Sequence, residues 1–132
     1  MTGINPKDQV GRTKPPMSCV PANVLAEIGV ALHEGATKYG RHNWRTAPVV
    51  ASVYYDAALR HLFSWWEGQD LDPDSGVHHV TKAIAGLVVL RDAMMLGTID
   101  DDRPPASEEG WEKQLHETMR ALVARHAKET PK

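Results

Sequence analysis

An apolar stretch over residues 73–96, followed by Gly97, constrains the fold of this chain more than any other feature. Its apolar residues recur at helical spacing, and a glycine after the last of them is a helix stop. They are Val77, Val80, Ile84, Leu87, Val88, Met94 and Met95. Small residues at Ala83, Ala85 and Gly86 permit close helix approach or leave room for a ligand. The stretch predicts a strongly apolar helix over about 73–96.

Periodicity and capping residues predict three more helices. The first covers about 21–39, and the second covers about 47–67 with Thr46 as its cap. The last covers about 107–128, with Ser107 as its cap and a narrow apolar stripe that suits a bundle or a partner subunit. No segment shows the alternation of a strand. The predicted fold is therefore all-α, with about four helices in a bundle.

The length of 132 residues predicts one domain over 1–132. The many prolines and glycines in 1–20 indicate an irregular arm, and the helix within 105–132 is an addition that ends in a short tail. A formal net charge of −2 gives no support to a nucleic-acid scaffold. No apolar run approaches the roughly 20 residues of a membrane span. The single Cys19 excludes an intrachain disulfide and fits a reducing, cytoplasmic compartment.

Residues 31–45 carry the chemistry of a candidate binding site. Glu34 and Lys38 lie one turn apart on the first predicted helix, and a polar and aromatic loop with Asn43 and Trp44 follows. One interpretation is a solvated helix face with a single ion pair. The other is a site for a metal-bound, phosphorylated planar ligand, because such a ligand needs an acid, cations, an amide and a flat ring.

Asp56, on the second predicted helix, is a second candidate acid. With Arg60 it forms either a surface pair or half of an inward polar site that faces Glu34. Two such carboxylates and nucleotide phosphates suit Mg²⁺, which takes oxygen ligands. Zinc is not favoured, because the neighbours His78 and His79 point about 100° apart on a helix and form no zinc pair.

The acidic connection over 68–76 has two alternative roles. Asp72 followed by Pro73 has the pattern of an N-cap at the start of the apolar helix. The alternative is a direct role in metal binding for Asp72, together with Asp70. The cap is the preferred interpretation.

Five motifs in order carry a family resemblance. They are TKPP and VP at 13–16 and 20–21, EGATKYGRHNWR at 34–45, YYDAALRHL at 54–62, GQDLDPDSG at 68–76 with His79, and DDRP at 101–104. Together they resemble the phage-type dATP/dGTP diphosphohydrolases, within the all-α (MazG-like) nucleoside triphosphate pyrophosphatase superfamily. The resemblance covers roughly residues 5–105, so the last predicted helix lies outside it.

The resemblance implies an enzyme that hydrolyses a purine deoxynucleoside triphosphate, dGTP or dATP, to the monophosphate and pyrophosphate. It also implies Mg²⁺ or Mn²⁺ as cofactor and a homodimer or homotetramer. A place in phage nucleotide metabolism is implied, such as the pathway to 2-aminoadenine, and hence a location in the host cytoplasm. No membrane or nucleic-acid partner is expected.

The same motifs assign roles to individual residues. The predicted catalytic acids and metal ligands are Glu34 and Asp56, with Glu27 as a base or outer-sphere candidate and Asp70 and Asp72 as further ligands. The predicted substrate-binding residues are Lys38, Tyr39, Asn43, Trp44, Arg60, His61, His79 and Lys82. The cations among them offset phosphate charge, Asn43 reads a base edge, and Trp44 or Tyr39 stacks on the base.

The chain departs from the superfamily pattern in its acids and histidines. Val53 stands three residues before Asp56, where relatives carry a glutamate, and Lys38 follows Glu34 by one turn. Lys82 stands where many relatives have a second histidine.

Two other functions compete with this one. A non-enzymatic helical module would use the second helix, with Tyr54, Trp65 and Trp66, as a binding surface. A phosphohydrolase that removes the whole triphosphate would use a His–Asp metal site, but no His and Asp are adjacent in this sequence.

Overall fold

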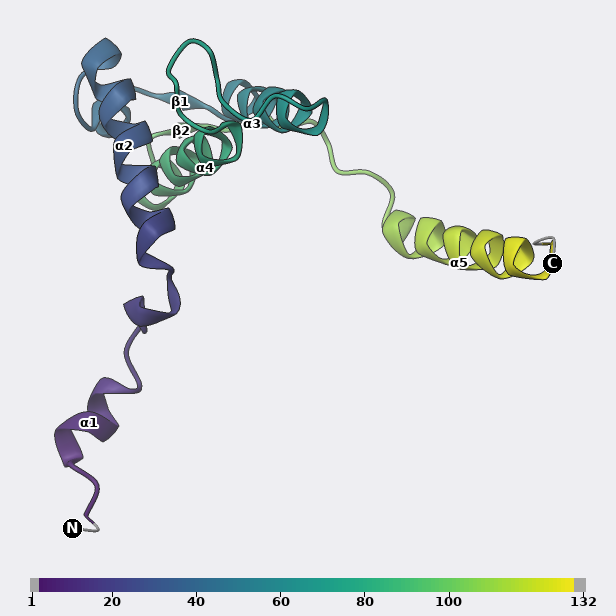
Figure 1. The fold of residues 1–132 in the computed structure, drawn as a ribbon, viewed down its shortest axis with the longest axis horizontal. Coiled ribbons are helices and arrows are strands. Elements are labelled where there is room, and N and C mark those ends of the chain that lie inside the picture. The colour runs from purple at the N-terminus through teal and green to yellow at the C-terminus, as the bar shows by residue number, and fades with distance from the viewer. Residues whose placement is uncertain (1–2, 130–132) are drawn as a thin grey trace. The chain divides into compact units, whose positions relative to one another are not determined.

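Helix α4 (His79–Leu96) organises the computed structural model, which describes residues 3–129. Helix α3 (Ala51–Trp66) packs along α4, and α2 (Ala22–Tyr39) packs on α4 as well (Figure 1). A helix with apolar residues on more than one side needs more than one neighbour to cover them, which explains the two partners. The residues of α4 that are buried are His79, Thr81, Ala83, Ala85, Val89 and Ala93.

The core around α4 is built mainly from small side chains. One cluster joins Ala31 of α2 to Val77 and Ala85, and a second joins Val49 to Val89 and Ala93. Small residues allow the helix backbones to approach closely. The predicted all-α class is confirmed, and the three central helices form its compact part.

A two-stranded parallel ladder, absent from the sequence prediction, joins the segment before α3 to the segment after α4. Strand β1 (Val49–Val50) pairs with β2 (Ile99–Asp100), in the register Val49 to Ile99. Gly97, with a φ of 74° in the left-handed region, ends α4 and turns the chain into β2. Two residues per strand are too few for an alternating pattern, so the sequence carries no signal for this ladder.

The ladder corrects the predicted start of the second helix. Helix α3 begins at Ala51 and not near 47, because Val49 and Val50 are used in β1. Thr46 therefore does not cap it. Asp102 serves instead: its carboxylate accepts a 2.8 Å hydrogen bond from the Ser52 backbone N–H and a second from the Ser52 hydroxyl. These bonds lower the pKa of Asp102.

The predicted start of the third helix is also wrong. Helix α4 begins at His79, and the side chain of His78 caps it by accepting a 3.1 Å hydrogen bond from the Val80 N–H. Asp72 belongs to the preceding loop, where its N–H donates to the Val77 carbonyl at 2.9 Å. Its carboxylate accepts from the Asp74 N–H at 3.0 Å and so caps a turn, not a helix.

The described termini lie outside the core. Residues before α2 form a short helix α1 (Pro6–Gly11) and a 3₁₀ turn (Met17–Cys19), with every described side chain exposed. The described chain divides into two compact units at Asp102 and Arg103, and α5 (Trp111–Glu129) lies in the second.

Helix α5 begins at Trp111, so Ser107 is not its cap. Its predicted apolar stripe is exposed within its own unit, as is every side chain described in that helix. Among residues 3–129, each helix is too short or too polar to cross a membrane.

Candidate functional site

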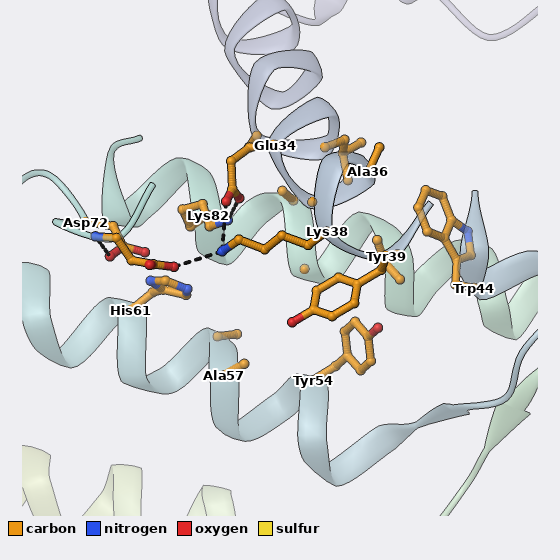
Figure 2. A pocket seen from close by; sticks show the side chains of 18 of the residues that line it. Glu34, Ala36, Lys38, Tyr39, Trp44, Tyr54, Ala57, His61, Asp72 and Lys82 are labelled. Atoms are coloured by element: carbon orange, nitrogen blue, oxygen red, sulfur yellow. Dashed lines mark hydrogen bonds and ion pairs between the residues drawn. The ribbon is translucent and has the colours of Figure 1, made fainter. Parts of the chain in front are cut away.

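A cavity of about 550 Å³ is lined by residues of α2, α3, α4 and the loops next to them (Figure 2). This volume lies within the range of roughly 300–1,000 Å³ typical of small-molecule sites. Small residues of the three helices line part of it, namely Ala31, Ala58, Ala85 and Gly86. Of the two roles considered for the small residues of this helix, close helix approach or room for a ligand, the cavity lining at Ala85 and Gly86 fits the second.

An acid held between two lysines forms the polar centre of the cavity. Glu34 Oε2 lies 2.7 Å from Lys82 Nζ, and Glu34 Oε1 lies 2.9 Å from Lys38 Nζ. Lys38 also contacts Asp74 at 2.8 Å (Figure 2). The hydrogen bond from Lys82, followed by that from Lys38, lowers the pKa of Glu34. The pKa of Lys38 is raised, chiefly by Asp74 and then by Glu34, so Glu34 and Lys38 are both charged at neutral pH.

The structure does not bring Asp56 to the cavity wall beside Glu34. Both oxygens of Glu34 are engaged by ammonium groups, and Asp56 is exposed and does not line the cavity. Residues 54, 57, 58, 60 and 61 of α3 line the cavity, and residue 56, one turn before Arg60, lies at the edge of that stripe and is not among them. The assignment of Glu34 and Asp56 to Mg²⁺ or Mn²⁺ therefore gains no support from this arrangement and stays a prediction.

Two further predicted acids also lie outside the cavity. Glu27 accepts a hydrogen bond from the Thr81 hydroxyl and does not line the cavity. Asp70 has a side chain that is 75% exposed, and its nearest ionic partner is His78 Nε2 at 4.0 Å. Neither acid is among the residues that line the cavity.

Aromatic side chains line the far end of the cavity. Tyr39, from the last turn of α2, is 72% exposed and lies beside Tyr54 of α3 in Figure 2. Trp44 is more firmly held, because its indole N–H donates to Asp92 Oδ2 at 2.7 Å and its carbonyl accepts from the Thr98 hydroxyl at 3.0 Å. The flat rings expected of a base-binding end are present, and the most exposed of them is Tyr39.

Asp92 holds this end of the site together. It accepts two hydrogen bonds from Arg45, at 2.9 and 3.0 Å, in addition to the one from Trp44. The pKa of Asp92 is lowered, first by Arg45 and then by Trp44. Asp92 lies 48 residues from Trp44 in the sequence, so no local pattern predicts that the two side chains meet.

Replacing Asp92 by alanine should lower the Tm, because the indole N–H of Trp44 loses its acceptor. A carboxylate whose pKa is lowered in the folded state stabilises at neutral pH, and that contribution is lost as the pH falls through the lowered pKa. The Tm difference between wild type and Asp92→Ala should therefore be largest at neutral pH and shrink in acid. Thermal unfolding followed by circular dichroism over this pH range measures it. Asp8→Ala, on α1, is the control that should leave the Tm unchanged.

Two histidines and an aspartate meet at the wall of the cavity. His61 Nδ1 of α3 lies 2.9 Å from His79 Nδ1 of α4, and Asp72 completes a group whose ligand atoms all lie within 4.8 Å of one another. His79 is 4% exposed, and its Nε2 lies 2.6 Å from Gln69 Oε1. Burial lowers the pKa of His61, which favours the neutral imidazole.

The structure thus brings together most of the predicted site. The predicted residues that line the cavity are Glu34, Lys38, Tyr39, Asn43, Trp44, Arg60, His61, Asp72 and Lys82, with His79 behind His61. Those outside it are Glu27, Asp56 and Asp70. Four residues that shape the site were not predicted for it: Tyr54, Gln69, Asp74 and Asp92.

Fold and cavity together define a small all-α protein whose ligand site has lysines at one end and aromatic rings at the other. Over residues 4–103 the sequence matches the family described as "dATP/dGTP diphosphohydrolase, N-terminal", and the chain belongs to that family. A dATP/dGTP diphosphohydrolase of Salmonella phage PMBT28 is 29% identical over 111 residues, which cover 84% of this chain and 34% of that protein. The chain thus matches about a third of that relative's length. No solved structure matches it.

Proposed function

We propose that the cavity binds a purine deoxynucleoside triphosphate, dGTP or dATP, and that the protein hydrolyses it to the monophosphate and pyrophosphate. The observation that carries this proposal is the pairing of Lys38 and Lys82 with Glu34 in a cavity whose other end is aromatic. The family description and the name of the phage relative support the same reaction and the same substrates.

The lysine end of the cavity suits the phosphates. Lys82 has an 18% exposed side chain, so its charge is less screened by water than that of a surface lysine. Lys38 and Arg60 add two more positive groups to the lining of the cavity. A triphosphate would draw both lysines partly away from Glu34, which keeps them aligned before the substrate arrives.

These cations act on the charge that develops during hydrolysis. The oxygen of water attacks the α-phosphorus, and the bond from that phosphorus to the α,β-bridging oxygen breaks. The leaving pyrophosphate takes the electron pair of this bond, and the attacking water gives its proton to the surrounding solvent. Lys38, Lys82 and Arg60 stabilise the charge on the leaving group, as positioned cations do in other phosphoryl-transfer sites.

The aromatic end suits the purine. Tyr39 and Tyr54 offer flat faces for stacking, and Asn43 places an amide on the same wall. Trp44 is held by Asp92 and so forms a fixed side of this end. We assign stacking to Tyr39 first, since it is largely exposed and a base can reach its ring without displacing other side chains.

We propose that turnover requires Mg²⁺ or Mn²⁺, as the resemblance implies, but we do not assign this ion to Glu34 or Asp56. We also propose a place in phage nucleotide metabolism, such as the pathway to 2-aminoadenine.

The second candidate function, an interaction module, is favoured by exposed apolar side chains on α3. Tyr55, Phe63 and Trp66 are 56%, 62% and 79% exposed in the single chain. A patch of this kind usually meets a partner. We propose that a second copy of this chain is that partner, which makes a foreign partner unnecessary.

Incubation with each of the four deoxynucleoside triphosphates and Mg²⁺ or Mn²⁺, followed by identification of the products, tests the proposal. We expect dGMP or dAMP together with pyrophosphate. Inorganic triphosphate as product would indicate the other class of phosphohydrolase, and no turnover of any nucleotide would favour the interaction module. Light scattering on the same sample gives the oligomeric state.

A further inference from the structure

The group formed by His61, His79 and Asp72 has the chemistry of a metal site that the sequence did not indicate. Its three ligand atoms come from α3, from α4 and from the loop between them, so the tertiary fold and not sequence spacing brings them together. Two imidazole nitrogens and one carboxylate oxygen suit a borderline ion such as Zn²⁺ or Co²⁺. Mg²⁺ prefers oxygen ligands throughout.

Gln69 prepares His79 for such a role. The Gln69 side-chain oxygen is an acceptor, so a hydrogen on His79 Nε2 donates to it at 2.6 Å. The neutral ring then carries its lone pair on Nδ1, the atom that faces His61 at 2.9 Å. Histidines that bind metals usually donate their other ring N–H in this way, which fixes the tautomer and the ring orientation.

The spacing of the three atoms also fits an ion. Bond lengths of roughly 2.0–2.2 Å to zinc place two tetrahedral ligand atoms roughly 3.3–3.6 Å apart. The two histidine nitrogens are at 2.9 Å and all three ligand atoms lie within 4.8 Å, so small shifts of each side chain are enough. Without an ion, the two nitrogens lie within hydrogen-bond distance of each other.

We propose that His61, His79 and Asp72 bind a divalent transition-metal ion of the zinc type at the wall of the cavity. His61 and Asp72 line the cavity, and both are labelled in Figure 2, so an ion held by them would be reached from it. Three protein ligands leave a coordination position for water or a ligand, as in zinc sites that are not purely structural. The inference stands apart from the proposed function, because it concerns ion binding without nucleotide.

Cobalt binding to the full chain tests it. Tag-free protein, first stripped with a chelator, is titrated with Co²⁺, and visible absorption reports a low-coordinate ion bound to nitrogen. We expect one Co²⁺ per chain, displacement by Zn²⁺, and no displacement by a large excess of Mg²⁺. Absence of such a spectrum at one equivalent, or equal competition by Mg²⁺, would overturn the proposal.

Variants assign the ion to these residues. Gln69→Ala, in an exposed loop, should weaken Co²⁺ binding about 10–100-fold, as loss of a partner of a metal-binding histidine commonly does. His61→Ala removes a ligand and should weaken it at least as much. His116→Ala, on α5, is the matched control and should bind as wild type. Circular dichroism checks the fold of each. If His61→Ala folds and binds Co²⁺ with unchanged affinity, the site is rejected. If His61→Ala does not fold, unchanged affinity in Gln69→Ala rejects it.

Discussion

Replacing Lys82 by methionine should lower kcat for dGTP or dATP hydrolysis by about 10²–10³-fold, the cost of removing one positioned group that stabilises transition-state charge. Methionine keeps much of the length of lysine and removes its charge. Lys82 is the less solvated of the two lysines on Glu34, with 18% of its side chain exposed against 42% for Lys38. Its charge is therefore worth more to the leaving pyrophosphate than that of a surface lysine.

Steady-state kinetics with direct detection of pyrophosphate measure this effect. Lys38→Met should cost less than Lys82→Met, because water and Asp74 screen Lys38. Lys113→Met, on the exposed surface of α5, should leave both kcat and KM at the wild-type values. A Lys82→Met protein that folds normally and turns over at the wild-type rate would show that the phosphates are bound elsewhere.

Local signals in the sequence were sufficient to predict a helix boundary where that boundary depends only on neighbouring residues. The first helix was predicted over 21–39 and is found at Ala22–Tyr39, because a proline precedes it and Gly40, with a φ of 90°, follows it. Gly97 ends α4 as predicted for the same reason. Glycine adopts a positive φ at little cost whatever its surroundings, so these helix ends can be found from the sequence.

The other boundaries depend on contacts far away in the chain. Helix α3 starts late because Val49 donates to the Thr98 carbonyl at 2.9 Å, a bond between residues that no local pattern connects. Helix α4 starts late because Asp72 pairs with Val77 inside the loop. An Asp–Pro pair predicts a turn or a cap equally well, and the tertiary fold decides between them.

The same distinction separates the predicted and the unpredicted parts of the site. Residues of one short stretch, including Glu34, Lys38 and Asn43, could be assigned together because they follow one helix end. Asp56 was predicted for the site on the assumption that its face of the second helix points into the cavity. The cavity is lined instead by the adjacent face, which carries Ala57 and His61. Asp92 acts only through partners distant in sequence, so spacing rules could not reveal it.

Glutamine in place of Glu34 should reduce kcat about 10²-fold while the fold is retained. We assign Glu34 the role of a positioning residue, since both of its oxygens hold lysines and neither is free for an ion. A neutral amide has one oxygen and an NH₂ group that repels an ammonium, so at least one lysine must move away. A displacement of about 1 Å in a positioned group is enough to cost about 10²-fold in rate.

Rescue and pH dependence separate this positioning role from a purely structural one. Glu34→Asp keeps the charge at shorter reach and should recover part of the activity, whereas a general loss of packing would not be restored. The lowered pKa keeps Glu34 ionised at neutral pH, so protonation of Glu34 should limit wild-type activity only below the usual glutamate range. Glu117→Gln on α5 serves as the matched control. Wild-type activity in a folded Glu34→Gln variant would remove Glu34 from the site and leave the alignment of Lys38 and Lys82 without a function.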